Sequence, residues 1–222
     1  MKNIKSAVGY LLWLLGARKI LPRAIVNGIR ISDCGEKMTE VTSNNKLVVK
    51  SKTGKVEFLR ADVLRRLIRA SQMLDDNMTL ILIEGFRSRE RQAQLWDAQL
   101  SVVKESHPNE SEEEQERITR LSVAKPVGMG GGHQTGGAVD VTLGDGNGLE
   151  LNMGTQVQEF SELTPTEARG VSEEVQSRRD LLLNIMNKSD FSNFPGEWWH
   201  FSYGDQMWAA YKKRKTAIYG PL

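Results

Sequence analysis

Residues 133–140 have the sequence HQTGGAVD, and residues 197–200 have the sequence EWWH. The alternation of side chains over residues 138–143 predicts a strand. The glycine pair before this strand allows the chain to fold back, so that His133 on a loop and Asp140 on the strand can converge. Two of the three histidines in the chain lie in these two segments. The pattern therefore predicts a polar site shared by segments that are far apart in the sequence.

The residue types in these segments are those that hold a catalytic zinc ion. Such an ion needs three nitrogen or carboxylate ligands and an open position for water, and His133, Asp140 and His200 supply that set. Glu197 would then move a proton from water to the leaving amine. Residues three apart in a regular strand face opposite sides, so Glu197 and His200 share a site only if the turn before them supplies the offset. Taken singly, a histidine or aspartate on a strand is more often structural, but the joint pattern favours one metal site.

The rest of the chain mixes helices and strands without regular alternation. This mixture indicates an α+β fold in which helices flank a central antiparallel sheet. Apolar periodicity and capping residues predict helices at 61–74, 89–100, 111–123 and 177–188, with another helix start at 164–167, strands at 79–83, 138–143 and 198–203, and a hairpin formed by 46–50 and 55–59.

Length and charge limit the classes of function. A chain of 222 residues is enough for one sizeable domain, and we expect residues 1–222 to form a single domain with residues 1–45 as an N-terminal extension. The formal net charge of +2 gives no strong field toward nucleic acid or anionic lipid. Function is therefore expected in a site that binds a small molecule.

The N-terminal extension carries an apolar stretch from Ala7 to Ala17 after Lys2 and Lys5. A membrane span needs about 20 apolar residues, so this stretch is too short to cross a bilayer. It favours an amphipathic or buried helix, with export to the periplasm or membrane tethering as the alternative. The single cysteine, Cys34, cannot form an internal disulfide, which favours the cytoplasm.

The two motifs together resemble a known family. His-x-x-Gly-x-Ala-x-Asp followed far downstream by Glu-x-Trp-His resembles the signature of the D-alanyl-D-alanine dipeptidases of the vancomycin-resistance type. This family belongs to a zinc D,D-peptidase group that shares its fold with the hedgehog signalling domain. The resemblance covers roughly residues 59–220, and its further matches are Glu84-Gly85-Phe86-Arg87, Met153-Gly154-Thr155 and the segment from Trp199 to Asp205.

The resemblance implies one zinc ion, a hedgehog-like fold and hydrolysis of D-Ala-D-Ala or closely related D-amino-acid dipeptides. It also gives Arg87 a role, because a fixed guanidinium beside the metal can stabilise the oxyanion of the tetrahedral intermediate. The alternative for Arg87 is a structural contact with a carboxylate or with the end of a helix.

The sequence departs from the family at both ends of the expected substrate. The dipeptidases usually have a serine two residues before the first ligand, where it helps to hold the substrate carboxylate, and this position is Gly131 here. They also have an aspartate that binds the free amine of the substrate, and the aligned residue is Gln158, or Glu159 if the register shifts by one.

These departures leave three functions open. The first is a zinc-dependent D-Ala-D-Ala dipeptidase. The second is a zinc D,D- or L,D-carboxypeptidase that acts on peptidoglycan peptides. The third is a non-catalytic zinc-binding module on the same fold, which Glu197 argues against because a structural site needs no base.

Overall fold

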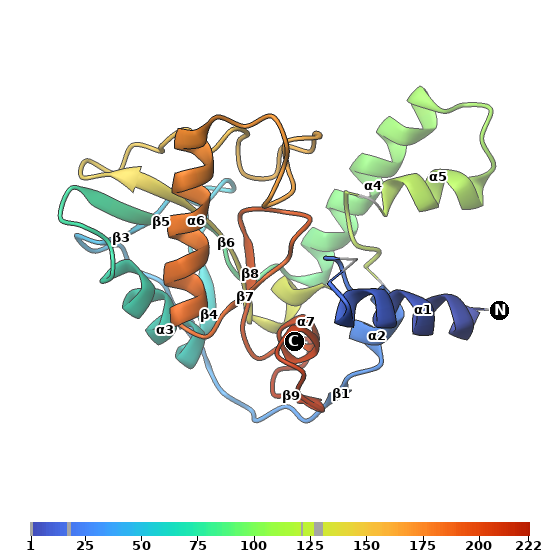
Figure 1. Cartoon of the computed structure of the whole chain (residues 1–222), viewed down its shortest axis with the longest axis horizontal. Helices are drawn as coiled ribbons and strands as arrows, with labels where there is room; N and C mark the ends of the chain where they lie inside the picture. Colours follow the sequence, from blue (N-terminus) through green and yellow to red (C-terminus); the bar gives the residue numbers. More distant parts are fainter. Residues whose placement is uncertain (1, 17–18, 121, 127–130) are drawn as a thin grey trace.

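The computed structural model describes residues 2–16, 19–120, 122–126 and 131–222, with side chains from residue 8 onward. At its centre lies a five-stranded sheet in the order β3-β5-β6-β8-β7 (Figure 1). All neighbouring pairs in it are antiparallel except β3 and β5, which are parallel. Its strands are β3 (Leu47–Val49), β5 (Met78–Glu84), β6 (Ala138–Asp145), β7 (Ser192–Asn193) and β8 (His200–Ser202).

The hairpin predicted at 46–59 is wrong. Its first strand is β3, which pairs with β5, and its second is β4 (Phe58–Arg60), which pairs with β2 (Met38–Glu40) in a separate sheet. Leu47 and Leu59 are both fully buried, so each half finds a buried place away from the other. Burial in the core therefore outweighs the local turn signal at Thr53-Gly54.

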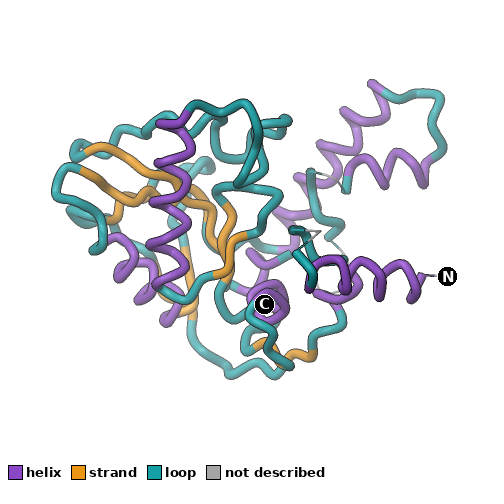
Figure 2. The backbone as a smooth tube through the Cα atoms, viewed as in Figure 1, coloured by secondary structure: helices purple, strands orange, loops and turns teal. Residues whose placement is uncertain are grey.

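Two helices pack beside the sheet and close the core. α3 (Ala61–Ser71) buries Val63, Leu67 and Ala70, and it contacts α6 (Glu173–Lys188). Figure 2 shows both helices beside the sheet strands. The α+β class predicted from the sequence is confirmed.

The helix predicted to start at 164–167 does not form. Thr164 accepts a hydrogen bond from the backbone of Ser161 in a turn, and its carbonyl accepts one from Trp198 N at 3.2 Å. Thr166 N donates to Pro195 O at 3.1 Å. The backbone of this segment thus forms hydrogen bonds with the loop that precedes β8. The next helix is α6, which begins after its N-cap Ser172.

A helical hairpin projects away from the sheet, at the upper right of Figure 1. It consists of α4 (Arg89–Ser106), capped by Ser88, and α5 (Glu112–Thr119), capped by Ser111. Both caps agree with the predicted helix starts, but α4 runs past the predicted end at residue 100.

The two ends of the chain lie together. β1 (Arg30–Ile31) pairs in parallel with β9 (Thr216–Ala217), and α2 (Arg23–Asn27) contacts α7 (Gln206–Tyr211). α1 (Lys2–Leu14) is the expected N-terminal helix. None of the described helices combines the length and apolar character needed to cross a lipid bilayer.

Candidate active site

The strand register brings three polar residues to one end of the sheet. Glu84 at the end of β5 is the cross-strand partner of Asp140, and Asp140 is the partner of His200 at the start of β8. Directly opposed residues have Cβ atoms about 5 Å apart, so these side chains can share one site. Asp140 is buried at the centre of the group.

His133 reaches this group from a short 3-10 helix, Gly132–Thr135, that precedes β6. The helix ends at Gly136, whose φ of 71° is the left-handed conformation that glycine adopts without strain. At Gly132, a Cβ would lie 2.4 Å from the Asp205 Oδ2 atom. Only glycine fits there without a shift of this buried carboxylate, so the two glycines fix the course of the loop that carries His133.

The three predicted metal ligands converge. The Asp140 Oδ1 atom lies 3.2 Å from His133 Nε2 and 3.0 Å from His200 Nδ1. One ligand atom from each residue can be chosen so that all three lie within 4.8 Å of one another. Tetrahedral zinc with ligands near 2.1 Å places neighbouring ligand atoms about 3.4 Å apart, so the set fits one zinc ion with little rearrangement.

The ionisation of the group also suits a metal. His133 Nδ1 donates to the Gly85 carbonyl at 2.7 Å, which fixes the ring with Nε2 facing Asp140. Burial alone would raise the pKa of Asp140, but His133 and His200 outweigh it and hold this pKa well below its usual value. Asp140 is therefore a carboxylate between two imidazoles, a donor set that zinc accepts.

Glu197 lies beside this group because the chain turns tightly before β8. Glu197 N donates to Phe194 O at 2.9 Å, and His200 N donates to Glu197 O at 3.2 Å. This turn supplies the offset that a regular strand would not, and it places Glu197 Oε2 4.0 Å from His200 Nδ1. Burial is the main cause that raises the pKa of the Glu197 carboxyl above its ordinary value, although His200 opposes the shift.

Arg87 is held rigidly by two side chains. Its Nε donates to Glu84 Oε1 at 2.7 Å and its Nη2 to Glu84 Oε2, while its Nη1 donates to Gln92 Oε1 at 2.9 Å. The guanidinium has five N–H groups, and two of them have no partner among the described residues. The contact of Arg87 with a carboxylate, one of the two interpretations from the sequence, is thus present, and the stabilisation of an oxyanion stays a prediction. Arg87 also lies close enough to Glu197 to lower the pKa of that residue.

Of the three expected substrate contacts, Gln158 lies closest to the metal ligands. Its amide nitrogen donates to Asp140 Oδ2 at 2.8 Å and also to Glu84 Oε2. Glu159 is exposed, and its carboxylate accepts a hydrogen bond from Gln156 N at 2.9 Å, so the structure does not bring it to the group. Gly131 precedes the His133 loop, and its N–H donates to Gln134 Oε1 at 3.1 Å. Residues 128–130 of the glycine-rich loop lie outside the described part of the chain.

Gln92 is a site residue that the sequence did not reveal. It is 1% exposed, and besides accepting from Arg87 it donates to Ala124 O at 2.7 Å. It therefore links Arg87 to the segment that follows α5. The only signal in the sequence is a polar residue on the face of α4 that also carries the buried Trp96.

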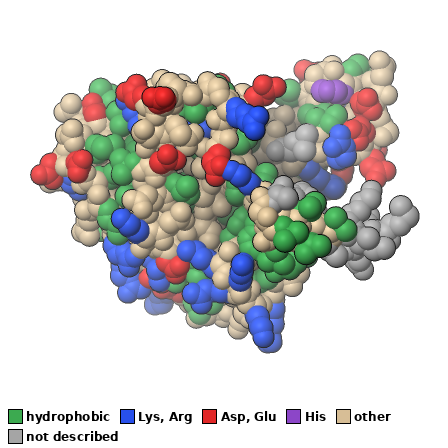
Figure 3. All heavy atoms as spheres, in the orientation of Figure 1, with side chains coloured by type: hydrophobic (Ala, Val, Ile, Leu, Met, Phe, Trp, Pro, Cys, Tyr) green, Lys and Arg blue, Asp and Glu red, His purple; other side chains and the backbone are tan. Residues whose placement is uncertain are grey.

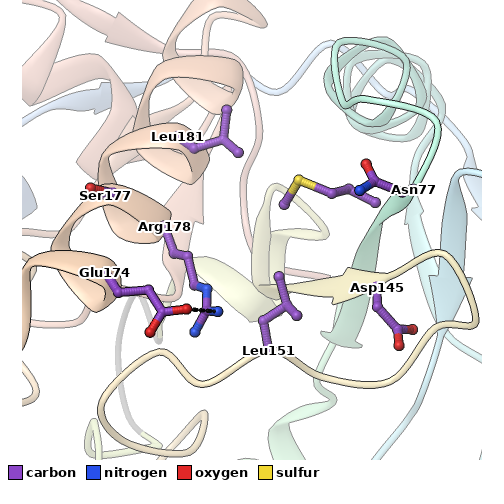
Figure 4. A pocket seen from close by; sticks show the side chains of 8 residues that line it. Asn77, Asp145, Leu151, Glu174, Ser177, Arg178 and Leu181 are labelled. Atoms are coloured by element: carbon purple, nitrogen blue, oxygen red, sulfur yellow. Dashed lines mark hydrogen bonds and ion pairs between the residues drawn. The ribbon is translucent and has the colours of Figure 1, made fainter.

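A hollow of about 400 Å³ lies at the other end of the same strands (Figure 4). Met78 at the start of β5 and Asp145 at the end of β6 line it, whereas the metal group lies at the opposite end of both strands. Its charged groups are engaged locally, because Arg178 pairs with Glu174 and Asp145 accepts from the backbone of its own turn. The hollow is therefore separate from the candidate active site.

Comparison with known proteins gives one family match that covers most of the chain. A family model described as D-ala-D-ala dipeptidase matches residues 36–218. A D-alanyl-D-alanine dipeptidase from Synechocystis is 41% identical over 105 residues, which are 40% of this chain and 42% of that protein. A D-alanyl-D-alanine dipeptidase from Escherichia coli K12 is 28% identical over 124 residues, which are 56% of this chain and 54% of that protein. The matches thus span about half the length of these curated relatives.

Two solved structures are weakly similar. One is VanYB in complex with D-Alanine-D-Alanine, with a TM-score of 0.47, 13% identity, and coverage of 86% of this chain and 94% of that chain. The other is a variant of the vancomycin resistance D,D-pentapeptidase VanY in complex with Zn(II), with a TM-score of 0.43, 16% identity, and coverage of 84% and 92%.

Proposed function

The chain belongs to the D-ala-D-ala dipeptidase family, and from this premise we propose that it is a zinc-dependent peptidase that hydrolyses D-Ala-D-Ala or closely related D-amino-acid dipeptides. The observation that carries the proposal is the convergence of His133, Asp140 and His200 on one point, with Glu197 beside it. These three residues would hold one zinc ion. When bound, the ion would activate a water molecule and polarise the scissile carbonyl.

Glu197 is the proton carrier in this proposal. Its carboxylate would accept a proton from the attacking water and deliver it to the nitrogen of the leaving amine. Burial raises its pKa, which makes it a stronger base than an exposed glutamate. The turn between Phe194 and His200 fixes its backbone at the edge of the metal group.

Arg87 would stabilise the oxyanion that forms as the carbonyl carbon becomes tetrahedral. The two N–H groups without a partner in the described part of the chain would serve this purpose, and the bidentate contact with Glu84 keeps the guanidinium from turning away. Donors that are fixed before the reaction need no reorganisation in the transition state, which is the main source of their effect on rate.

Gln158 favours a second candidate, a zinc D,D- or L,D-carboxypeptidase acting on peptidoglycan peptides. Its amide nitrogen is committed to Asp140 and Glu84, so only the neutral carbonyl oxygen remains for a ligand. A neutral acceptor attracts a substrate ammonium less than the carboxylate typical of the dipeptidases would, and a charge-assisted hydrogen bond contributes about 1.5–3 kcal/mol. A peptide with a blocked amine therefore loses less binding free energy at Gln158 than it would at the carboxylate of a typical dipeptidase.

One assay tests the activity and separates the candidates. The zinc-loaded enzyme is given D-Ala-D-Ala and, in parallel, N-acetyl-D-Ala-D-Ala. Dipeptidase action predicts hydrolysis of the free dipeptide and little of the acetylated one, whereas carboxypeptidase action predicts hydrolysis of the acetylated peptide.

The variant Glu197→Gln, which keeps the shape of the side chain, is expected to bind zinc and lose activity by about a thousandfold, since general base catalysis typically contributes 10²–10⁴-fold. Zinc binding by the native chain without hydrolysis of either peptide would favour the non-catalytic module instead. Full activity of Glu197→Gln would contradict the role of Glu197.

The compartment and the domain organisation stay predictions. Cys34 is an exposed free thiol, which supports the cytoplasm over an exported location. The pairing of β1 with β9 supports a single domain, because it joins the N-terminal extension to the C-terminal end of the chain. Fractionation of cells and limited proteolysis would test these two expectations.

A further inference from the structure

The described side chains of the N-terminal helix α1 contact the rest of the protein through one side of the helix. Gly9 is buried, and the ring of Trp13 meets the ring of Tyr211 edge-on at 6.1 Å. Tyr10 stacks on Trp13 at 5.8 Å, and Lys213 Nζ lies 5.6 Å from the centre of the Trp13 ring. These contacts fix which face of the helix is turned to the protein.

The opposite face is apolar and exposed. Val8, Leu11 and Leu15 follow one another at the three- and four-residue spacing that places them on one side of a helix, and they are 51%, 55% and 71% exposed. The hydrogen bond from Leu15 N to Leu11 O continues this geometry past the end of the helix. Leu12 and Leu14 flank the stripe and are also exposed. Figure 3 shows a group of hydrophobic side chains on the surface in the region where Figure 1 draws α1.

The apolar stripe of this helix faces solvent and not the core. A helix on the surface of a soluble protein normally turns its apolar stripe toward the core. Here the exposed leucines form one contiguous group, and contiguous exposed apolar surface marks an interaction site more often than single exposed residues do.

The charge of the N-terminal sequence points to the kind of partner. The first acidic residue in the chain is Asp33, and six basic residues precede it: Lys2, Lys5, Arg18, Lys19, Arg23 and Arg30. Lys19 pairs with Glu167, whereas Arg23 and Arg30 are exposed. An apolar stripe accompanied by charge of one sign matches a membrane surface that carries anionic lipids, because apolar side chains enter the acyl boundary while cations meet the headgroups.

We propose that α1 binds the surface of anionic membranes and lies along the interface with Val8, Leu11 and Leu15 inserted. The helix has 13 residues and is therefore about 20 Å long, less than the roughly 30 Å of the hydrocarbon core, so it lies on the membrane without crossing it. The proposal is independent of the peptidase activity, since no residue of the metal group takes part.

The test is co-sedimentation of the full chain with vesicles. Binding to vesicles of phosphatidylcholine and phosphatidylglycerol is expected to exceed binding to pure phosphatidylcholine, and added salt is expected to weaken it. The double variant Leu11→Gln with Leu15→Gln is expected to lower the partition constant roughly tenfold or more, because two large apolar side chains no longer enter the membrane.

A matched control uses apolar residues that are exposed elsewhere to a similar extent. The double variant Leu149→Gln with Val102→Gln changes side chains that are 63% and 56% exposed, and it is expected to bind like the native chain. Equal sedimentation of the two double variants, or no preference for phosphatidylglycerol, would overturn the proposal. Light scattering tests the alternative that a second copy of the chain covers this face. The proposal would be overturned if the native chain were a dimer that does not bind vesicles and if the double variant Leu11→Gln with Leu15→Gln were a monomer.

Discussion

At the scale of single residues, Gln92 is the side chain that orients Arg87 from the helical hairpin. It accepts from Arg87 Nη1 at 2.9 Å and is itself fixed by Ala124 O. We expect Gln92→Leu to lower kcat/KM about tenfold, because a hydrogen bond to a charged group contributes roughly 1.5–3 kcal/mol and Glu84 still holds the other edge of the guanidinium. Zinc affinity should not change, since Gln92 contacts none of the three metal ligands among its described hydrogen bonds.

The control for this prediction is Gln94→Leu, which makes the same change on an exposed position of α4. Steady-state kinetics on D-Ala-D-Ala and a zinc titration against a chelator are the measurements. If the two variants lose the same activity, or if Gln92→Leu also loses zinc, Gln92 does not act through Arg87.

Gly131 offers a test of how the substrate carboxylate is held. A Cβ at this position would meet nothing closer among the described residues than the Ala124 Cβ atom at 3.9 Å, so a side chain fits. We expect Gly131→Ser, which restores the residue typical of the dipeptidases, to lower KM for D-Ala-D-Ala about fivefold by adding one hydrogen bond.

The neighbouring glycine is the matched control. A Cβ at Gly132 would lie 2.4 Å from Asp205 Oδ2 and 2.9 Å from the Ala138 Cβ atom. Gly132→Ser is therefore expected to displace the His133 loop and reduce both zinc affinity and thermal stability. An unchanged KM in Gly131→Ser would show that residue 131 does not face the substrate.

The residue scale also shows what the sequence could predict of the site. His133, Asp140, His200 and Glu197 come together because two short motifs carry their spacing and their turns. The contacts of Gln158 with Asp140 and Glu84 could not be predicted, since they depend on a loop in which Gln158 itself has a φ of 65°. The link from Gln92 to Ala124 depends equally on how the helical hairpin folds back.

At the scale of elements, the loop between β6 and α6 is organised by one buried cation. Arg179 is 1% exposed and donates to the carbonyls of Met153, Leu163 and Pro165. Burial lowers the pKa of Arg179 to about 10, so it stays charged at neutral pH. This single side chain satisfies backbone acceptors on both sides of Gln158 and thereby shapes the loop that reaches the metal group.

We expect Arg179→Lys to destabilise the protein by about 2–4 kcal/mol, because an ammonium cannot reproduce the planar set of donors and leaves buried carbonyls unsatisfied. Arg178→Lys is the control, since Arg178 is more exposed and pairs with Glu174 at the surface. Chemical denaturation measures the difference. Equal stability of the two variants would mean that the loop does not depend on Arg179.

Elements with strong periodicity are predictable, and those that depend on distant partners are not. α3 and α6 were expected because their apolar residues repeat at helical spacing, and α4 and α5 because Ser88 and Ser111 cap them. β3 and β4 have the local pattern of a hairpin, yet each pairs with another strand because burial of Leu47 and Leu59 is decided by the whole core. The segment around Thr164 does not start a helix, because its backbone forms hydrogen bonds with the distant residues Pro195 and Trp198.

At the scale of the whole molecule, one buried arginine ties the chain ends to the metal group. Arg60 Nη2 donates to Asp33 Oδ2 at 2.9 Å and to Gly220 O at 3.3 Å, and Arg60 Nε donates to Thr135 O at 2.9 Å. The N-terminal segment, the C-terminal segment and the His133 loop therefore meet at one side chain. We therefore expect a change at the metal group to affect the contacts that join the two ends of the chain.

Zinc binding should therefore stabilise the folded chain as a unit. A ligand present at a hundred times its dissociation constant adds about 2.7 kcal/mol to the free energy of unfolding. For a chain of this size each kcal/mol raises Tm by roughly 2–4 °C, so we expect zinc to raise Tm by about 5–10 °C and a chelator to reverse the rise.

His133→Ala removes a ligand and should abolish the shift. His107→Ala is the matched control, because His107 is exposed in the helical hairpin, and it should keep the full shift. Calorimetry with and without zinc measures both, and a shift that survives in His133→Ala would place the zinc ion elsewhere.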